Sequence, residues 1–269
     1  MASAQKDSNV LKAYFLLLFV ISWTVFSLML YCILTIIPFY DQRTYIPFYH
    51  RVLCRLMGVK IVLKGNMSTH SPTLFVSNHV SYLDIPVLGS LINAGFVAKS
   101  EIANWPFINV LARIQNTIFI ERKASKAKAQ IAIIRERLND NYSLILFPEG
   151  TSTNGAEVLP LKSSLFSAAE PMDIDKKIYI QPISVVYAQH NDSGMNQDVR
   201  DHFAWYADFP FGSHFFKMLS KGSITAVITF NEPVLFSDFS SRKDCANACE
   251  QVMRTSFEKA FTESDSTKS

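Results

Sequence analysis

The sequence predicts an α/β protein with a mixed, largely parallel sheet flanked by helices and preceded by an N-terminal membrane anchor. The first observation is an apolar stretch without any charged residue, which runs from Ala13 to Tyr40. A helix needs only about 20 apolar residues to cross the core of a bilayer. The second observation is that short runs rich in Val and Ile alternate with helix-like segments between residues 59 and 261. Such alternation is typical of α/β domains, and 269 residues leave room for one large domain behind the anchor.

Residues 1–58 are expected to form the membrane anchor. The apolar region of a signal peptide is shorter and ends in small residues, whereas this stretch ends in Ile-Pro-Phe-Tyr. The chain could cross the bilayer once with a tilt. It could instead break near Pro38 and continue as a second, amphipathic helix on the membrane surface over residues 45–57. The sequence leaves both arrangements open.

Basic residues follow the apolar stretch. Between residues 41 and 64 only Asp41 is acidic, and the basic residues are Arg43, Arg51, Arg55, Lys60 and Lys64. Positive charge favours the cytoplasmic side and attracts anionic lipid headgroups. We therefore expect the body of the protein to lie at the cytoplasmic face of a membrane. The net charge of the whole chain is only +3, which does not suggest a nucleic-acid partner.

The four cysteines do not form the pattern of a disulfide framework. Cys245 and Cys249 lie one helical turn apart, without further Cys or His residues at a zinc-binding spacing. A reducing compartment is therefore expected, and no metal site is predicted.

The body of the protein, residues 59–261, is expected to be one domain. Strands are predicted over residues 59–63, 73–77, 95–98, 117–120, 144–147, 178–187 and 224–230. Helices are predicted over residues 85–92, 105–114, 125–139 and 244–261, and Ser125 is expected to cap the third of them. The polar tail, residues 262–269, is expected to be disordered.

The interval 189–221 interrupts this alternation. It is dense in His, Asp and aromatic residues, too long for a simple connection and too apolar for a disordered one. The pattern fits a lid or lipid-facing insertion as well as it fits a packed satellite cluster.

Asn78, His79 and Asp84 follow the strand predicted over residues 73–77. A loop at the end of a strand is a common place for active-site groups, because a rigid scaffold holds it. Since Asp84 lies five residues after His79, its carboxylate can fold back on the imidazole, fix the tautomer and stabilise the cation formed on proton uptake. The alternative is a polar strand end in which Asp84 only caps the next helix.

Two further predicted strands are followed by polar groups. Glu121 and Arg122 follow one, and the segment Pro-Glu-Gly-Thr-Ser, residues 148–152, follows the other. Taken alone, Arg122 fits a surface ion pair and Glu149 fits a helix cap. The glycines here do not complete a phosphate-binding loop, because Ala-Glu stands where Lys-Ser/Thr is required. The sequence also lacks the Gly-x-Ser-x-Gly motif of many serine hydrolases.

In this combination and order, the motifs resemble those of the 1-acylglycerol-3-phosphate acyltransferase family, which are membrane-bound glycerolipid acyltransferases. The resemblance covers about residues 60–233. The family motif N-H-x-x-x-x-D matches Asn78-His79 and Asp84, and a strand that closes on an arginine matches IFIER, which ends at Arg122. In the second block, Gln115-Asn116 stands where many members have Gly.

Three further segments continue the resemblance. The motif F-P-E-G-T-x-S matches residues 147–152, with Thr153 following, so that the final hydroxyl position is shifted or shared. A V-P-I-like strand matches residues 181–183, and a K-x-E step matches Lys99 to Glu101. Each block alone is weak, whereas four in order behind an apolar anchor are specific.

The resemblance implies acyl transfer from acyl-CoA or acyl-ACP to the free hydroxyl of 1-acylglycerol-3-phosphate, which gives phosphatidate. His79 would be the general base, because an ordinary imidazole with a pKa of about 6.5 suits that role at neutral pH, and Asp84 would hold it in place. No cofactor beyond the thioester co-substrate is implied. The residues expected to bind substrate are Asn78, Lys99, Arg122, Glu149, Gly150, Thr151 and Ser152. Glu149 is expected to order Arg122 or Lys99, or to bind a hydroxyl of the acceptor.

Two alternatives stay open. Residues 202–208, together with His214-Phe-Phe, look similar to a branch of the same family that acylates lyso-ornithine lipid, whose headgroup has a carboxylate and an amine instead of a phosphate. The other alternative is a non-catalytic lipid-binding membrane protein, which would have no need of the His79 and Asp84 combination.

Overall fold

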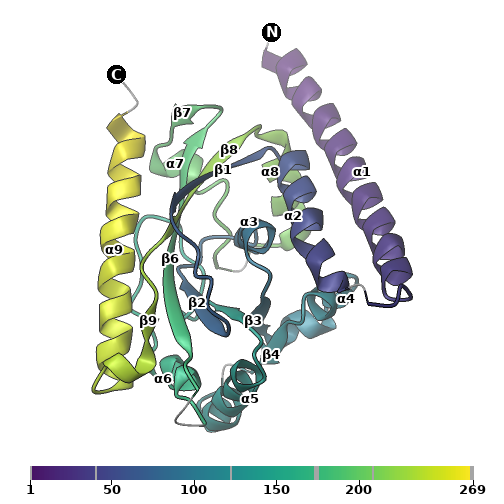
Figure 1. Cartoon of the computed structure of the whole chain (residues 1–269). Helices are drawn as coiled ribbons and strands as arrows, with labels where there is room; N and C mark the ends of the chain where they lie inside the picture. The colour runs from purple at the N-terminus through teal and green to yellow at the C-terminus, as the bar shows by residue number, and fades with distance from the viewer. Residues whose placement is uncertain (1, 40, 122, 173–175, 208, 267–269) are drawn as a thin grey trace.

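A nine-stranded mixed sheet forms the centre of the protein (Figure 1). The computed structural model describes residues 2–39, 41–121, 123–172, 176–207 and 209–266. The main strand order is β1-β8-β6-β2-β5-β3-β4, in which every neighbouring pair is parallel except β6 with β8. β7 and β9 pair antiparallel with β6. The predicted mixed, largely parallel sheet is thus confirmed. The strands are β1 (Val59–Gly65), β2 (Thr73–Ser77), β3 (Gly95–Lys99), β4 (Ile118–Ile120), β5 (Leu144–Leu146), β6 (Tyr179–His190), β7 (Ser193–Gly194), β8 (Ile224–Phe230) and β9 (Val234–Leu235).

Helices cover both faces of the sheet. Figure 1 shows α1, α2 and α8 on one side of the sheet and α9 on the other. The α-helices of the described residues are α1 (Ala2–Leu34), α2 (Tyr45–Leu56), α3 (Asp84–Leu91), α4 (Ile108–Ile114), α5 (Ala127–Asn139), α6 (Ser163–Phe166), α7 (Gln197–Arg200), α8 (Phe211–Ser220) and α9 (Arg242–Ser266).

Alternation along the strands builds two hydrophobic clusters, one on each face. In β2, Phe75 belongs to the cluster beneath α2, α3 and α8, whereas Leu74 and Val76 belong to the cluster beneath α5, α6 and α9. Every residue of β2 is buried. A strand that is buried on both faces reads as a continuous apolar run, which is why its bounds were predictable.

The anchor segment is a pair of helices. Trp23 of α1 donates an indole hydrogen bond to the backbone oxygen of Tyr49 in α2 at 3.2 Å, and the hydroxyl of Tyr45 donates to Ser27 Oγ at 3.1 Å. Only 11% of the most apolar window of α1 is buried, within a candidate membrane helix that runs from Asn9 to Leu34. Two helices therefore lie within residues 2–56, and most of the apolar window of α1 is exposed; whether α1 crosses a bilayer stays a prediction.

Three local expectations differ from the structure. Ser125 does not cap α5, because the helix starts at Ala127 and its N-cap residue, Lys126, makes no side-chain capping bond. The helix expected from residue 105 starts at Ile108, behind the turn at Pro106. α9 continues to Ser266, so a helix occupies the first part of the tail that was expected to be disordered.

The interval 189–221 is packed against the domain. It forms β7, α7 and α8, and five of its residues belong to the hydrophobic core: Met195, Phe203, Ala204, Met218 and Leu219. This packing agrees with the expected satellite cluster. One edge of the interval also reaches the anchor, since the Phe216 ring of α8 lies 4.8 Å from the Tyr14 ring of α1.

Candidate active site

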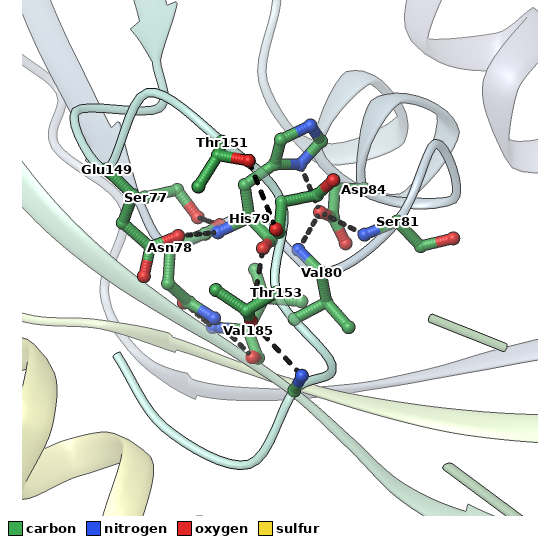
Figure 2. A network of polar contacts seen from close by, with 12 residues as sticks. Ser77, Asn78, His79, Val80, Ser81, Asp84, Glu149, Thr151, Thr153 and Val185 are labelled. Carbon is green, nitrogen blue, oxygen red and sulfur yellow. Dashed lines mark hydrogen bonds and ion pairs between the residues drawn. The ribbon is translucent and has the colours of Figure 1, made fainter. Parts of the chain in front are cut away.

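His79 and Asp84 lie at the carboxyl end of β2, where the chain leaves the sheet and enters α3. The Nδ1 atom of His79 lies 2.7 Å from Oδ2 of Asp84, as Figure 2 shows. The carboxylate is fully buried, whereas 17% of the His79 side chain is exposed. The predicted fold-back across five residues is therefore present, and we refer to it as the His79–Asp84 pair.

The Asp84 carboxylate accepts three further hydrogen bonds. The backbone N–H groups of Val80 and Ser81 donate to Oδ2 at 2.8 and 3.0 Å, and the Tyr187 hydroxyl of β6 donates to Oδ1 at 2.7 Å. A buried carboxylate needs such donors, because its charge has lost its contact with water. The loop and β6 thus hold Asp84 in one orientation.

The imidazole of His79 is fixed by stacking as well as by its hydrogen bond. Its ring lies on the ring of Phe147 with a centroid distance of 4.1 Å and an interplanar angle of 20°. The second ring nitrogen, Nε2, has no hydrogen-bond partner among the described residues and points away from Asp84 (Figure 2). With Nδ1 engaged by the carboxylate, Nε2 is the atom that can accept a proton from a substrate.

Glu149 supports the loop through backbone contacts. Its Oε2 accepts the N–H of His79 and its Oε1 accepts the N–H of Leu159, both at 2.8 Å. Burial raises the pKa of Glu149 to about 8, although these two hydrogen bonds oppose the shift. Both carboxyl oxygens face the main chain, and Lys99, one of the two cations expected beside Glu149, forms its ion pair with Glu101 instead.

Asn78 joins β2 to β6. Its amide nitrogen donates to the carbonyl oxygen of Val185 at 2.9 Å, and its amide oxygen accepts the N–H of Val185 at 2.7 Å (Figure 2). The residue is buried, with 1% of its surface exposed. Its polar atoms are therefore used by the scaffold, and the expected contact of Asn78 with substrate has no support in this structure.

The turn after β5 lies beside a cation that the sequence prediction missed. Gly150 adopts a φ of +73°, and a β-carbon there would collide with the ammonium end of Lys162. The N–H of Lys162 donates to the oxygen of Pro148 at 2.9 Å, which brings Lys162 back to the turn. Nearby, the hydroxyl of the exposed Thr151 reaches the oxygen of half-buried Ser152 at 3.3 Å. Gly150, Thr151, Ser152 and Lys162 are thus grouped at one turn.

Thr153 connects this turn to the histidine loop. Its N–H donates to the carbonyl oxygen of His79 at 2.9 Å, and its hydroxyl accepts the N–H of Gly155 at 3.1 Å. Thr153, the hydroxyl residue that follows the F-P-E-G-T-x-S match, therefore supports the backbone of the active-site loop.

The two remaining residues that were expected to bind substrate are Lys99 and Arg122. Lys99, at the end of β3, forms an exposed ion pair with Glu101 at 3.0 Å, and no contact in the described part of the chain joins it to the His79–Asp84 pair. Arg122 lies outside the described residues. Within those residues, no group of three or more His, Cys, Asp or Glu side chains is placed to hold a metal ion.

Tyr187 and Phe147 are site residues that the sequence prediction did not assign. Tyr187 shares one face of β6 with Ile183 and Val185, within the same hydrophobic cluster. A hydroxyl at an inward position of an otherwise apolar strand was the available signal, since a buried Tyr needs a hydrogen-bond partner. Nothing in the sequence indicated that this partner would be Asp84.

Known proteins share both the sequence pattern and the fold. Residues 58–186 match the protein family described as Acyltransferase. A lyso-ornithine lipid O-acyltransferase of Rhodobacter capsulatus is 39% identical over 219 residues, which cover 80% of this chain and 77% of that protein. A protein of the same name from Rhizobium meliloti is 33% identical, with 79% and 74% covered. A 1-acyl-sn-glycerol-3-phosphate acyltransferase of Neisseria gonorrhoeae is 27% identical, with 58% of each chain covered.

One solved structure matches nearly the whole chain. The crystal structure of the 1-acyl-sn-glycerophosphate acyltransferase PlsC from Thermotoga maritima aligns with a TM-score of 0.68, over 96% of this chain and 97% of that one. The sequence identity is 20%, so this likeness concerns the fold. The segment that matches the Acyltransferase family includes His79, Asp84 and Glu149.

Proposed function

Because this chain belongs to the membrane-bound glycerolipid acyltransferase family, we propose that it transfers an acyl group from a thioester to the hydroxyl of a lyso-ornithine lipid. The site observation that supports this proposal is the His79–Asp84 pair, in which a buried carboxylate holds Nδ1 and leaves Nε2 free to act as a base. The choice of acceptor is supported by the two lyso-ornithine lipid O-acyltransferases, which are 39% and 33% identical over about four fifths of this chain.

The proposed reaction needs one proton relay. Nε2 of His79 takes the proton of the acceptor hydroxyl while the hydroxyl oxygen attacks the thioester carbonyl carbon. The C–S bond then breaks, the new C–O bond leaves an ester, and the thiolate takes the proton from the imidazolium. The Asp84 carboxylate stabilises the imidazolium between these two steps, because the negative charge lies 2.7 Å from Nδ1.

The anionic group of the acceptor would bind at the turn after β5. Lys162 contributes an exposed ammonium group beside Gly150, and the turn contributes backbone N–H groups and the Thr151 hydroxyl. The carboxylate of an ornithine headgroup could pair with the Lys162 ammonium group at this turn. Contact of Arg122 with the same group stays a prediction from its place after β4.

The second candidate is acylation of 1-acylglycerol-3-phosphate, which the motifs alone favoured. The relative with that name in Neisseria gonorrhoeae is 27% identical and covers 58% of this chain, a lower identity over a shorter segment than the lyso-ornithine lipid enzymes. Both candidates use the same base and the same thioester chemistry, and they differ in the acceptor lipid.

The outward apolar face of α1 supports a membrane location for the reaction. We propose the cytoplasmic face, because the basic cluster from Arg43 to Lys64 follows α1 and because acyl-CoA and acyl-ACP are cytoplasmic thioesters. Anionic lipid headgroups would contribute about 1 kcal/mol per basic residue near the surface.

The test is an acyl-transfer assay with the full-length protein in vesicles. Labelled acyl-CoA or acyl-ACP is offered with lyso-ornithine lipid or with 1-acylglycerol-3-phosphate, and kcat/KM is compared. We expect lyso-ornithine lipid to be preferred, and His79→Ala to lower the rate by about two to four orders of magnitude. The matched control is His70→Ala. His70 is exposed and lies just before the start of β2, whereas His79 follows the end of that strand.

The two parts of the proposal fail separately. A preference for 1-acylglycerol-3-phosphate would overturn the acceptor and keep the acyl-transfer chemistry. Activity of His79→Ala within about tenfold of the wild type would overturn the role of the His79–Asp84 pair.

A further inference from the structure

A patch of apolar side chains lies at the start of α4 and α8. Trp105, Pro106, Phe107 and Ile108 line a hollow of about 620 Å³ together with Phe211 of α8, and we call these five residues the aromatic patch. The Phe107 side chain is 83% exposed, and its backbone adopts a φ of +63°. A large apolar residue in a left-handed conformation gains nothing from such exposure in water. The patch is therefore a candidate contact surface.

The aromatic patch is connected to the active-site loop by edge-to-face contacts between aromatic rings. The Phe211 ring lies 5.0 Å from the ring of Tyr82, which is located between His79 and Asp84 in the chain. The Trp105 ring lies 6.2 Å from the ring of Trp205. The backbone N–H of Trp205 donates to the carbonyl oxygen of Val80 at 2.9 Å. The patch thus contacts, through Tyr82 and Trp205, the loop that carries the His79–Asp84 pair.

Helix α8 lies between the aromatic patch and α1. α8 contains Phe211 of the patch and also Phe216, whose ring lies 4.8 Å from Tyr14 of α1. From Tyr14 onward, α1 exposes large apolar side chains over its whole length, among them Phe15, Leu18 and Phe19. Helix α8 therefore joins the aromatic patch to α1, whose exposed side is apolar.

The charges around the patch fit an anionic lipid surface. Between residues 102 and 114 the only charged residue is Arg113, and between residues 209 and 221 the only charged residues are Lys217 and Lys221. Trp and other aromatic residues favour the membrane–water interface, and a basic fringe attracts anionic headgroups. A groove for a protein partner would not require this connection to α1 through α8.

We propose that the aromatic patch is a second membrane-contacting element, which inserts into the interface of the bilayer beside the active-site loop. It fixes the orientation of the catalytic domain on the membrane, so that the opening above His79 faces the leaflet that holds the acceptor. The proposal concerns the docking surface and is independent of which lyso-lipid is acylated.

The test places a fluorescent reporter on the patch of the full-length protein. Phe107→Cys is labelled with an environment-sensitive nitrobenzoxadiazole group in a Cys32→Ser background, because the other three cysteines are buried. The control is Met172→Cys with the same label, at a side chain that is 71% exposed and lies beyond β5, in the segment after α6. Both proteins are bound to vesicles of phosphatidylcholine and phosphatidylglycerol, with or without brominated acyl chains.

We expect the label at residue 107 to shift to the blue and to lose about half of its emission on brominated vesicles, because it lies at the level of the acyl chains. The label at residue 172 should do neither. Equal behaviour of the two labels would overturn the proposal, because the two proteins have the same α1 and differ only in the labelled position.

A second variant tests the aromatic patch without a label, in case the label disturbs the turn at residue 107. Phe107→Asp should weaken binding to anionic vesicles by about tenfold, whereas Met172→Asp should change it little. The circular-dichroism spectrum of each variant shows that the fold is retained. Unchanged vesicle binding by a folded Phe107→Asp protein would contradict the insertion of the patch.

Discussion

The hydroxyl of Tyr187 in β6 donates a hydrogen bond of 2.7 Å to Asp84 Oδ1, the carboxylate oxygen that does not contact His79. Both residues are buried. The interaction connects the central strand of the sheet to the start of α3 and sets the angle at which Asp84 presents Oδ2 to the imidazole. Tyr187 is therefore a positioning residue for the His79–Asp84 pair.

Tyr187→Phe removes this donor and keeps the ring. We expect kcat to fall about tenfold with little change in either KM, because the base is misoriented while the substrate contacts remain. Stability should fall by about 1–3 kcal/mol, since one buried carboxylate oxygen loses its partner. Steady-state kinetics and urea denaturation measure the two effects. The control is Tyr179→Phe at the start of the same strand, which should leave kcat unchanged, and an unaltered kcat in Tyr187→Phe would exclude the positioning role.

Asn78→Asp tests the connection between β2 and β6. The substitution retains an oxygen that accepts the N–H of Val185, but it places a second oxygen against the carbonyl of Val185, where the amide now donates. We expect a loss of about 2–4 kcal/mol in the free energy of unfolding, with the acceptor KM unchanged in the protein that remains folded. Asn93→Asp, at an exposed position, is the control. A raised acceptor KM at wild-type stability would instead restore the substrate contact expected from the sequence.

Glu149 should make stability depend on pH. Burial raises its pKa from 4.5 to about 8, so the folded protein binds this proton more tightly than the unfolded chain does. The stabilising contribution is complete below pH 4.5 and is lost as the pH rises through about 8. We expect the unfolding free energy to decline over this window in the wild type, and the same decline to be smaller in Glu149→Gln, which cannot ionise.

Glu101→Gln is the control for this measurement. Its hydrogen bond to Lys99 lowers the pKa of Glu101, so any contribution from this residue changes below pH 4.5 and not above it. Denaturation curves across the neutral range should therefore have the same pH dependence in Glu101→Gln as in the wild type. An identical pH dependence in Glu149→Gln and the wild type would show that Glu149 is already ionised in the folded protein.

Two glycine substitutions should have opposite effects. A β-carbon at Gly89 of α3 would come within 2.7 Å of the ring of His50 in α2, and His50 is held by Gln115 at 2.6 Å. Gly89→Ala should therefore separate α2 from α3 and lower stability by about 1–3 kcal/mol. At Gly212 of α8 a β-carbon would meet no atom of the described residues within 4 Å, and Gly212→Ala should stabilise the helix by up to about 1 kcal/mol. Thermal unfolding compares the two, and equal effects would contradict tight packing between α2 and α3.

Local patterns predicted the sheet and the His79–Asp84 pair well. β2 and β8 have the bounds that their apolar runs indicated, because such runs are long enough to specify a buried strand. His79 and Asp84 are five residues apart, so their contact follows from one turn of chain. The cap at Ser125 failed because the identity of a polar residue does not fix the residue at which a helix starts.

The remaining features of the site depend on contacts between distant segments. Glu149 looked like a partner for a cation, but its oxygens bind the backbone N–H groups of His79 and Leu159, which no side-chain pattern indicates. The amide of Asn78, a residue predicted to bind substrate, pairs with Val185 of a strand 107 residues further on, and no local pattern indicates this contact. Lys162 was overlooked because a single lysine near a turn has no sequence signature.

The long separation between these partners also sets the order in which the protein can become active during its synthesis. Asp84 precedes Tyr187 by 103 residues, and Asn78 precedes Val185 by 107. α1 leaves the ribosome before either pair is complete, and β8, which pairs with β1, follows later still. A nascent chain that ends before β6 contains both His79 and Asp84 but not the strand that fixes them. Translation therefore delivers the apolar helix α1 first and the strand that completes the His79–Asp84 pair more than 140 residues later, so that the pair is held in place only on a chain whose α1 has already emerged.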